Sequence, residues 1–175
     1  MCGIIGYIGN RKASDIILKG LTRLEYRGYD SAGISTIEDS RLQITKCSGK
    51  ISDLQKSVNK NSHNGNIGIG HTRCATHGEP STANSHPHND YNNKISIIHN
   101  CIIEIYFSIK QFLLKKNINF KSDTDTETLV HLISHIHDSN DFDFEESFKL
   151  SILTITNTTN SAMFGIEKMD FANLI

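Results

Sequence analysis

The sequence predicts a single domain of the α+β class, and three observations predict it. Short runs of apolar and β-branched residues, typical of buried strands, recur along the chain. Segments with apolar residues at helical spacing lie between and after these runs. The 175 residues contain neither an internal repeat nor a linker, so we expect both kinds of element in one domain.

The first half of the chain alternates strands with helices. Its clearest local feature is a hairpin, because Asp39 and Ser40 join two strand-like segments and a two-residue connection suits a tight turn. The elements expected here are a strand at 3–9, a helix at 12–25, strands at 32–38 and 41–47, a helix at 52–59 and a strand at 66–72.

The second half begins with a segment dense in Gly, Pro, His, Asn and Ser. Residues 73–91 are therefore expected to form a long surface loop, and loops of that length are usually functional. Thr124 and Glu127 form a capping box that places Asp125 in the first turn of a helix. The other elements expected here are a strand at 95–100, helices at 105–116 and near 144–151, and strands near 151–156 and 162–167.

Composition excludes several classes of function. The net charge of −1 and the isoelectric point of 6.7 indicate no excess of positive charge for binding nucleic acid or an anionic membrane. No apolar stretch of transmembrane length and no signal peptide is seen, so the expected location is the cytoplasm. The widely spaced Cys2, Cys47, Cys74 and Cys101 are expected to be free thiols, with no metal or cofactor.

Cys2 is the strongest candidate for a nucleophile. Removal of the initiator Met would make it the first residue, with a free α-amino group whose pKa is ordinarily roughly 7.7 to 8.0. Such an amine can take the proton of the thiol beside it and so generate a thiolate. The alternative is that position 2 holds an incidental small residue, and a bare Met-Cys start favours that alternative.

The segments that follow change this balance. They read LEYRGYDSAG at 24–33, GHTRCATHGEPS at 70–81, NSHPHND at 84–90, IIHNCIIE at 97–104 and SDTDTE at 122–127. With Gly3 and Gly6 beside Cys2, they resemble in order the landmarks of the class II glutamine amidotransferases, which are amino-terminal nucleophile hydrolases. The sequences of these motifs are similar to those of the glucosamine-6-phosphate synthase branch, rather than to those of the amidophosphoribosyl or asparagine branches. The resemblance covers about residues 1–135 well.

The resemblance implies a fold, a reaction and a partner. The fold is a four-layer αββα sandwich in which Cys2 lies on the opening strand. The reaction is hydrolysis of L-glutamine to glutamate and ammonia, and a sugar-phosphate isomerase part, absent here, normally delivers the ammonia to fructose 6-phosphate for hexosamine biosynthesis. We therefore expect one glutamine amidotransferase type-2 domain over 1–175, incomplete at its apolar carboxyl end, with a separate isomerase subunit as a candidate partner.

The resemblance also assigns residues that bind the substrate. Arg73 matches the arginine that holds the α-carboxylate of glutamine, as a planar cationic fork can do. Asp125 matches the acid that holds its ammonium group. The loop residues expected around the bound amino acid are Thr76, His77 and Gly78, although His77 without the motif could equally be a surface histidine.

The oxyanion hole is assigned in the same way, and here the chain departs from the family. Asn100 matches the side-chain donor, and the backbone N–H of Cys101, where the family has glycine, matches the second donor. If that backbone is left-handed, the cysteine is expected to strain it. Cys74 replaces a tryptophan that gates ammonia passage, and Ile105 replaces an asparagine, which puts the polar network around Glu104 in doubt.

Three other features have simpler interpretations. His131 and His135 have helical ligand spacing but no acidic third ligand in register, so a solvated helix face is favoured over a metal site. The acidic run 138–146 lacks the glycine and spacing of a calcium loop. His86 and His88 are assigned to loop structure and not to metal binding.

Two hypotheses of different classes remain open. The first is a glutamine-hydrolysing enzyme domain, active alone or with a separate acceptor part. The second is a catalytically impaired remnant that binds at most glutamine or a partner protein. Cys101 and the expected truncation are the features that separate them.

Overall fold

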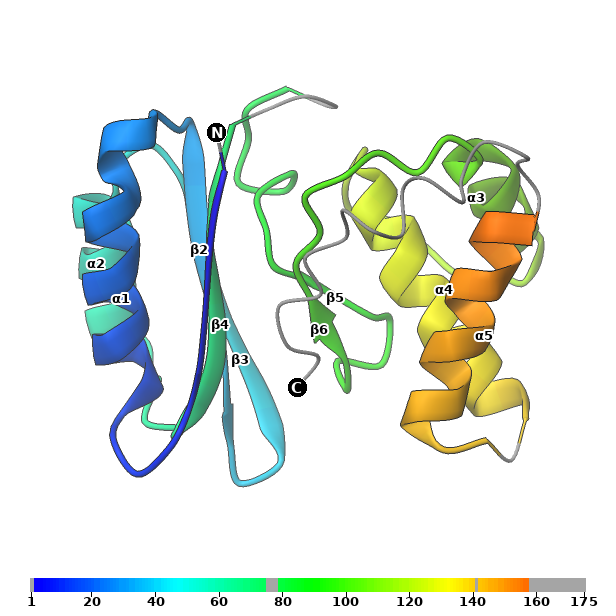
Figure 1. Cartoon of the computed structure of the whole chain (residues 1–175), viewed down its shortest axis with the longest axis horizontal. Coiled ribbons are helices and arrows are strands. Elements are labelled where there is room, and N and C mark those ends of the chain that lie inside the picture. The colour runs from blue at the N-terminus through cyan, green and yellow to red at the C-terminus, as the bar shows by residue number, and fades with distance from the viewer. Residues whose placement is uncertain (1, 75–78, 141, 158–175) are drawn as a thin grey trace.

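The computed structural model describes residues 2–74, 79–140 and 142–157. Its main feature is a four-stranded antiparallel sheet with strand order β1-β4-β2-β3. Two helices, α1 and α2, cover one face of this sheet, and a two-stranded ribbon followed by three helices lies on the other side (Figure 1). The described residues therefore form an α+β structure with an antiparallel sheet, as predicted.

The four strands lie close to where the sequence predicts them. They are β1 (Gly3–Ile8), β2 (Ser31–Glu38), β3 (Arg41–Ser48) and β4 (Ile67–Arg73). The predicted hairpin joins β2 to β3 through Asp39 and Ser40, whose φ angles of 48° and 60° are those of a type I′ turn. This turn fixes a register in which Glu38 faces Arg41 and Ser31 faces Ser48.

Helices α1 (Ala13–Leu24) and α2 (Ile51–Lys60) form the first core with the sheet, and the short 3-10 helix η1 (Glu25–Arg27) follows α1. Gly70 on β4 allows α1 to approach the sheet closely, because a Cβ there would lie 2.2 Å from Ile17. The buried apolar residues of this core are Ala13, Ile17, Leu18, Leu21, Ala32, Ile34, Ile51, Leu54 and Val58.

The second core lies among the remaining elements. These are the ribbon of β5 (His88–Asn89) and β6 (Ser96–Ile97), followed by α3 (Tyr106–Lys115), α4 (Asp125–Ser139) and α5 (Phe144–Asn157). Helix α4 is buried on all sides over its first turns, from Asp125 to Ser134. As predicted, it begins at the Thr124 cap, whose hydroxyl accepts a hydrogen bond from Glu127 N at 3.3 Å.

The strand expected near 151–156 is wrong, because α5 continues as a helix to Asn157. Its run of β-branched residues is typical of a strand, but Phe144, Phe148, Ile152 and Ile155 recur at helical spacing and pack against the second core. Ser151 also bonds within the helix, donating to Ser147 O at 2.7 Å. The strand expected at 162–167 lies outside the described residues.

The segment 73–91 is not a surface loop throughout. Asn84, Ser85, His86, His88 and Asp90 are all buried, because residues 84–90 pass between the sheet and α4 (Figure 1). The strand expected at 95–100 is shortened to Ser96–Ile97, which pairs with β5 over two residues.

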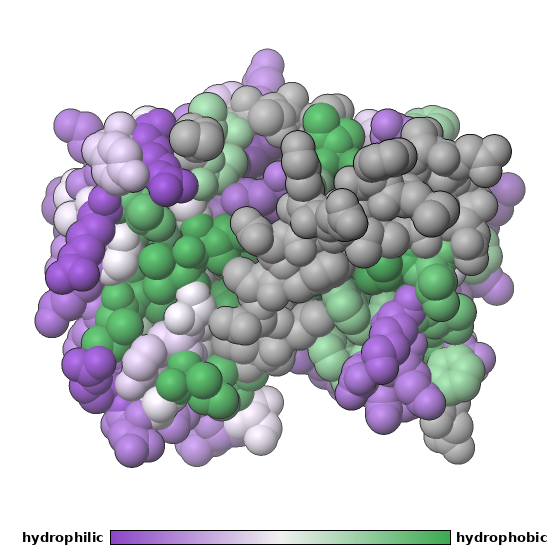
Figure 2. All heavy atoms as spheres, viewed as in Figure 1, coloured by the Kyte–Doolittle hydropathy of each residue, from purple (hydrophilic) through white to green (hydrophobic). Residues whose placement is uncertain are grey.

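Strands β1 and β3 are the edges of the four-stranded sheet. Figure 2 shows apolar side chains gathered on the face of the molecule over this sheet, and Ile8 on β1 is 77% exposed. No helix among the described residues is long and apolar enough to cross a lipid bilayer.

Candidate active site

Cys2 immediately precedes β1, and the pairing of β1 with β4 holds it against the end of β4. Gly3 pairs with Thr72, and Gly3 N donates a hydrogen bond to Thr72 Oγ1 at 3.0 Å. The Cys2 sulfur accepts a hydrogen bond from the backbone N–H of Cys74 at 3.2 Å and lies 3.7 Å from the carbonyl oxygen of that residue.

A cavity of about 60 Å³ adjoins Cys2 and collects side chains from distant parts of the chain. Five of the eight residues expected to act in catalysis or substrate binding line it, namely Cys2, Arg73, Asn100, Cys101 and Asp125. The residues that complete its lining are His71, Cys74, His86, His99 and Thr124. The expected loop residues Thr76, His77 and Gly78 lie outside the described residues.

The side chain of Asn100 is oriented by a hydrogen bond to His71. Burial lowers the pKa of His71 to about 4, an effect that the bond with Asn100 only partly opposes. The ring is therefore neutral at pH 7, and its Nε2–H donates to Asn100 Oδ1 at 2.8 Å. The amide must then direct its own NH₂ group away from His71, which leaves a donor for another acceptor.

Further buried histidines surround this pair. The rings of His71 and His86 meet edge to face at 4.7 Å, and those of His86 and His88 at 4.8 Å. Burial holds the pKa of His86 well below its usual range and lowers that of His88 to about 3. Burial also lowers the pKa of His99, and the charge of Asp125 opposes this. The three histidine rings that line the cavity, those of His71, His86 and His99, are consequently neutral at pH 7.

The two charged residues expected to bind glutamine come from different elements. Arg73 ends β4 and is only 4% exposed, while Asp125 begins α4 and is 7% exposed. Asp125 Oδ2 accepts a hydrogen bond from Ile103 N at 2.9 Å, which ties α4 to the chain that follows Asn100. A guanidinium and a carboxylate thus border the same cavity as the Cys2 sulfur.

The departures from the family pattern have limited effects on this geometry. Among the described residues, the non-glycine residues with positive φ are Asp39, Ser40, Asn93 and Asn117. Cys101 therefore carries none of the left-handed strain considered for it. Ile105 packs against the second core at the start of α3.

The sequence interpretation missed His71 and His99, which lie in the GHTR and IIHNC segments but received no role. It was also wrong about the face of α4. His131 is only 2% exposed, and Glu127 is the acid in register with it, four residues earlier, with Oε1 at 3.5 Å from His131 Nε2. Within the described residues, no group of three or more His, Cys, Asp or Glu side chains is arranged to hold a metal ion.

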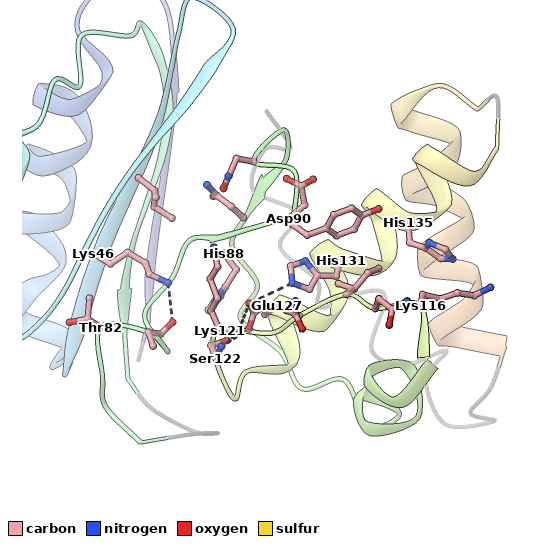
Figure 3. A pocket seen from close by; sticks show the side chains of 18 residues that line it. Lys46, Thr82, His88, Asp90, Lys116, Lys121, Ser122, Glu127, His131 and His135 are labelled. Carbon is pink, nitrogen blue, oxygen red and sulfur yellow. Dashed lines mark hydrogen bonds and ion pairs between the residues drawn. The ribbon is translucent and has the colours of Figure 1, made fainter. Parts of the chain in front are cut away.

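A second, larger cavity of about 840 Å³ lies between β3 and α4 (Figure 3). Lys46 reaches from β3 toward the 82–91 segment and donates to Ala83 O at 3.0 Å. The acids of this cavity hold the backbone in place: Glu127 accepts from the backbone N–H of Lys121 and Ser122. The paired rings of His86 and His88 separate it from Cys2, so the smaller cavity is the candidate active site.

Comparison with known proteins places this geometry in a family context. A family model described as a glutamine amidotransferase domain matches residues 43–153. The glutamine–fructose-6-phosphate aminotransferase (isomerizing) of Pyrococcus horikoshii is 54% identical over 156 residues, which are 89% of this chain and 26% of that protein. The protein of the same name from Streptococcus agalactiae serotype III is 42% identical over 170 residues, or 97% of this chain and 28% of that protein.

Two solved structures also match the fold of this chain. The glutamine phosphoribosylpyrophosphate amidotransferase from B. subtilis, complexed with ADP and GMP, matches with a TM-score of 0.72 and 27% identity, over 88% of this chain and 33% of its own. A structure described as the allosteric regulatory enzyme of purine biosynthesis matches with a TM-score of 0.73 at the same identity and coverage. The family model covers more than half of the 175 residues, and the chain therefore belongs to the glutamine amidotransferase domain family.

Proposed function

We propose that this chain hydrolyses L-glutamine to glutamate and ammonia, with Cys2 as the nucleophile. The observation that carries the proposal is the convergence of Cys2, an oriented amide, a guanidinium and a carboxylate on one cavity. A nucleophile, an oxyanion donor and two groups of opposite charge meet the needs of amide hydrolysis on a free amino acid.

Each group has a distinct role in the proposed reaction. After removal of Met1, the α-amine of Cys2 takes the thiol proton, and the sulfur attacks the side-chain carbonyl of glutamine. The NH₂ group of Asn100 and the backbone N–H of Cys101 donate to the oxyanion of the tetrahedral intermediate. Ammonia leaves with the proton from the α-amine, and water then hydrolyses the glutamyl thioester.

Substrate recognition uses the two charges at the border of the cavity. Arg73 binds the α-carboxylate, and Asp125 binds the α-ammonium group. Thr76, His77 and Gly78, from the segment that follows Arg73, complete the glutamine site. The neutral histidine wall adds no competing positive charge, so the selectivity for an amino acid depends on these two ionised side chains.

The same proposal includes the full fold type of the chain and the acceptor of the ammonia. We assign the chain to the four-layer αββα sandwich as a single glutamine amidotransferase type-2 domain, with the β5–β6 ribbon as part of the second sheet. The chain spans about a quarter of the length of the relatives that it matches, 26% for the Pyrococcus horikoshii protein. A separate part with sugar-phosphate isomerase activity would accept the ammonia on fructose 6-phosphate, as the names of those relatives suggest.

Glutamate release by the purified chain tests the proposal directly. We expect turnover of L-glutamine by the chain from which Met1 has been removed, its loss in Cys2→Ala, and its retention in the matched variant Cys47→Ala. The diazoketone analogue of glutamine should label Cys2 in preference to Cys47 or Cys74, as peptide mass mapping would show. Preferential labelling of either other cysteine would contradict the role of Cys2.

The impaired-remnant alternative makes a different prediction in the same preparation. A remnant would bind glutamine without releasing glutamate, so turnover by the unaltered chain separates the two hypotheses. Calorimetry on Cys2→Ala then shows whether the glutamine site itself is intact. Binding to Cys2→Ala together with no turnover by the unaltered chain would favour the remnant. The backbone of Cys101, which lacks positive φ, removes one reason to expect impairment.

A further inference from the structure

Three of the four cysteines meet at one cavity. Cys2, Cys74 and Cys101 all line the cavity of about 60 Å³, whereas Cys47 lies on β3 and packs against the first core. None of the four forms a disulfide. The nucleophile of the proposed reaction therefore has two thiols beside it.

Cys74 is in direct contact with Cys2. Its nitrogen lies 3.2 Å and its carbonyl oxygen 3.7 Å from the Cys2 sulfur. Both atoms belong to the backbone of Cys74, so the Cys2 sulfur lies against the peptide groups on either side of the Cys74 Cα. Cys74 is exposed, and rotation about its Cα–Cβ bond can turn its own sulfur toward Cys2.

Access to oxidants differs between the two sulfurs in a way that suits a sequential reaction. Cys2 is partly buried in the cavity and Cys74 is exposed at its edge. A small oxidant can reach Cys2, and the neighbouring exposed thiol can then resolve the oxidised sulfur. An accessible thiol beside a second one is the arrangement found at redox-sensitive cysteines.

We propose that Cys2 and Cys74 form a reversible disulfide when the chain meets a peroxide, which makes the pair a modification site. The Cys2 thiol reacts with hydrogen peroxide to form an S–O bond, giving a sulfenic acid and one water as the O–O bond breaks. The Cys74 thiol then attacks the Cys2 sulfur, an S–S bond forms, the S–O bond breaks and a second water leaves. The two sulfurs together lose two electrons, which peroxide accepts.

The disulfide has two consequences for Cys2. Its sulfur can no longer attack glutamine, so oxidation stops turnover until a dithiol reductant breaks the bond. The sulfur is also protected from further oxidation to sulfinic acid, which dithiols do not reverse. The effect on turnover rests on the proposed function, while the disulfide itself does not.

The test follows thiols and activity in the same samples of the full chain. After hydrogen peroxide, alkylation of free thiols should fall from four to two per chain, with one cross-linked peptide that joins Cys2 to Cys74. Dithiothreitol should restore all four. In Cys74→Ser the cross-link should be absent and Cys2 should reach sulfinic acid, whereas Cys47→Ser should form the same cross-link as the unaltered chain.

Two results would overturn the inference. One is sulfinic acid on Cys2 of the unaltered chain at peroxide doses that leave Cys74 free. The other is a cross-link from Cys2 to Cys101 that persists unchanged in Cys74→Ser. A reduced chain that forms the Cys2–Cys74 cross-link but releases no glutamate would refute the proposed function and leave the disulfide established.

Discussion

Acidification from pH 7 to pH 5 should destabilise the folded chain through His71. Burial lowers the pKa of this histidine from 6.5 to about 4. As pH falls through 6.5, the unfolded chain takes up a proton on His71, but the folded chain does not until about pH 4. Proton uptake by the unfolded state alone favours unfolding, so the contribution of His71 is present above pH 6.5 and is lost toward pH 4.

The size of the effect follows from the same pKa values. A difference of about 2.5 pKa units corresponds to about 3 kcal/mol when the whole window is crossed. Linkage restricted to the interval from pH 7 to pH 5 gives a loss of about 2 kcal/mol from His71 alone. Burial lowers the pKa of His86 and His88 in the same direction, so the total loss should be larger. Domains of this size are stable by only about 5–15 kcal/mol.

Urea titrations followed by far-ultraviolet circular dichroism at pH 7, 6 and 5 would measure this loss. His71→Gln keeps a donor for Asn100 but removes the titrating group, so its loss over the same interval should be smaller by about 2 kcal/mol. Glu127 does not interfere, because burial raises its pKa but hydrogen bonds outweigh this and lower it to about 2, so its contribution disappears only below about pH 4.5. Equal losses in the unaltered chain and in His71→Gln would refute the reasoning.

Four further predictions concern single side chains. Asn100→Ala should lower kcat for glutamine about 100- to 1000-fold with little change in KM, because its amide meets the oxyanion near the transition state. Steady-state kinetics in which KM rises and kcat is unchanged would count against this. Cys101→Gly should leave kcat within about twofold, since its φ is not positive, and a tenfold gain would contradict it. Thr124→Ala should lower the free energy of unfolding by about 1 kcal/mol through loss of the α4 cap, measured by urea titration. Gly33→Ala should lower it by about 1–3 kcal/mol, because the new Cβ would lie 2.2 Å from His86 O, and an unchanged midpoint would show that the loop can move away.

Elements with strong local signals could be predicted from the sequence. The β2–β3 hairpin depends on two adjacent residues, Asp39 and Ser40, that tolerate left-handed backbone. The start of α4 depends on one hydroxyl at Thr124. These features are set within a few residues, and therefore the sequence alone suffices to place them.

Elements decided by tertiary packing were predicted less well. The β-branched run near 151–156 favours a strand locally, but burial of its helical apolar face against the second core outweighs that preference. Burial of the 84–90 segment depends on Gly33, where the backbone of His86 passes too close for any side chain. The burial of 84–90 has no local signal, whereas the spacing of Phe148, Ile152 and Ile155 could have indicated the helix.

The candidate site divides in the same way. The motif segments identified Cys2, Arg73, Asn100 and Asp125, and the fold brings all four to one cavity. The orientation of Asn100 by a neutral His71 could not be predicted, because it depends on burial that only the packed structure creates.

The strand order has a consequence for how the chain matures as it is made. Among the residues that the structure describes, β1 pairs only with β4, so the beginning of the chain stays without its partner until residues 67–73 have been synthesised. Asn100 and Asp125 come later still, and a site whose parts are so far apart in sequence closes late in folding. A nascent chain therefore carries the proposed nucleophile from the start but gains the proposed oxyanion donor and substrate-binding acid only after residues 100 and 125 have been made. Amide hydrolysis is therefore not expected of the nascent chain before these groups are assembled.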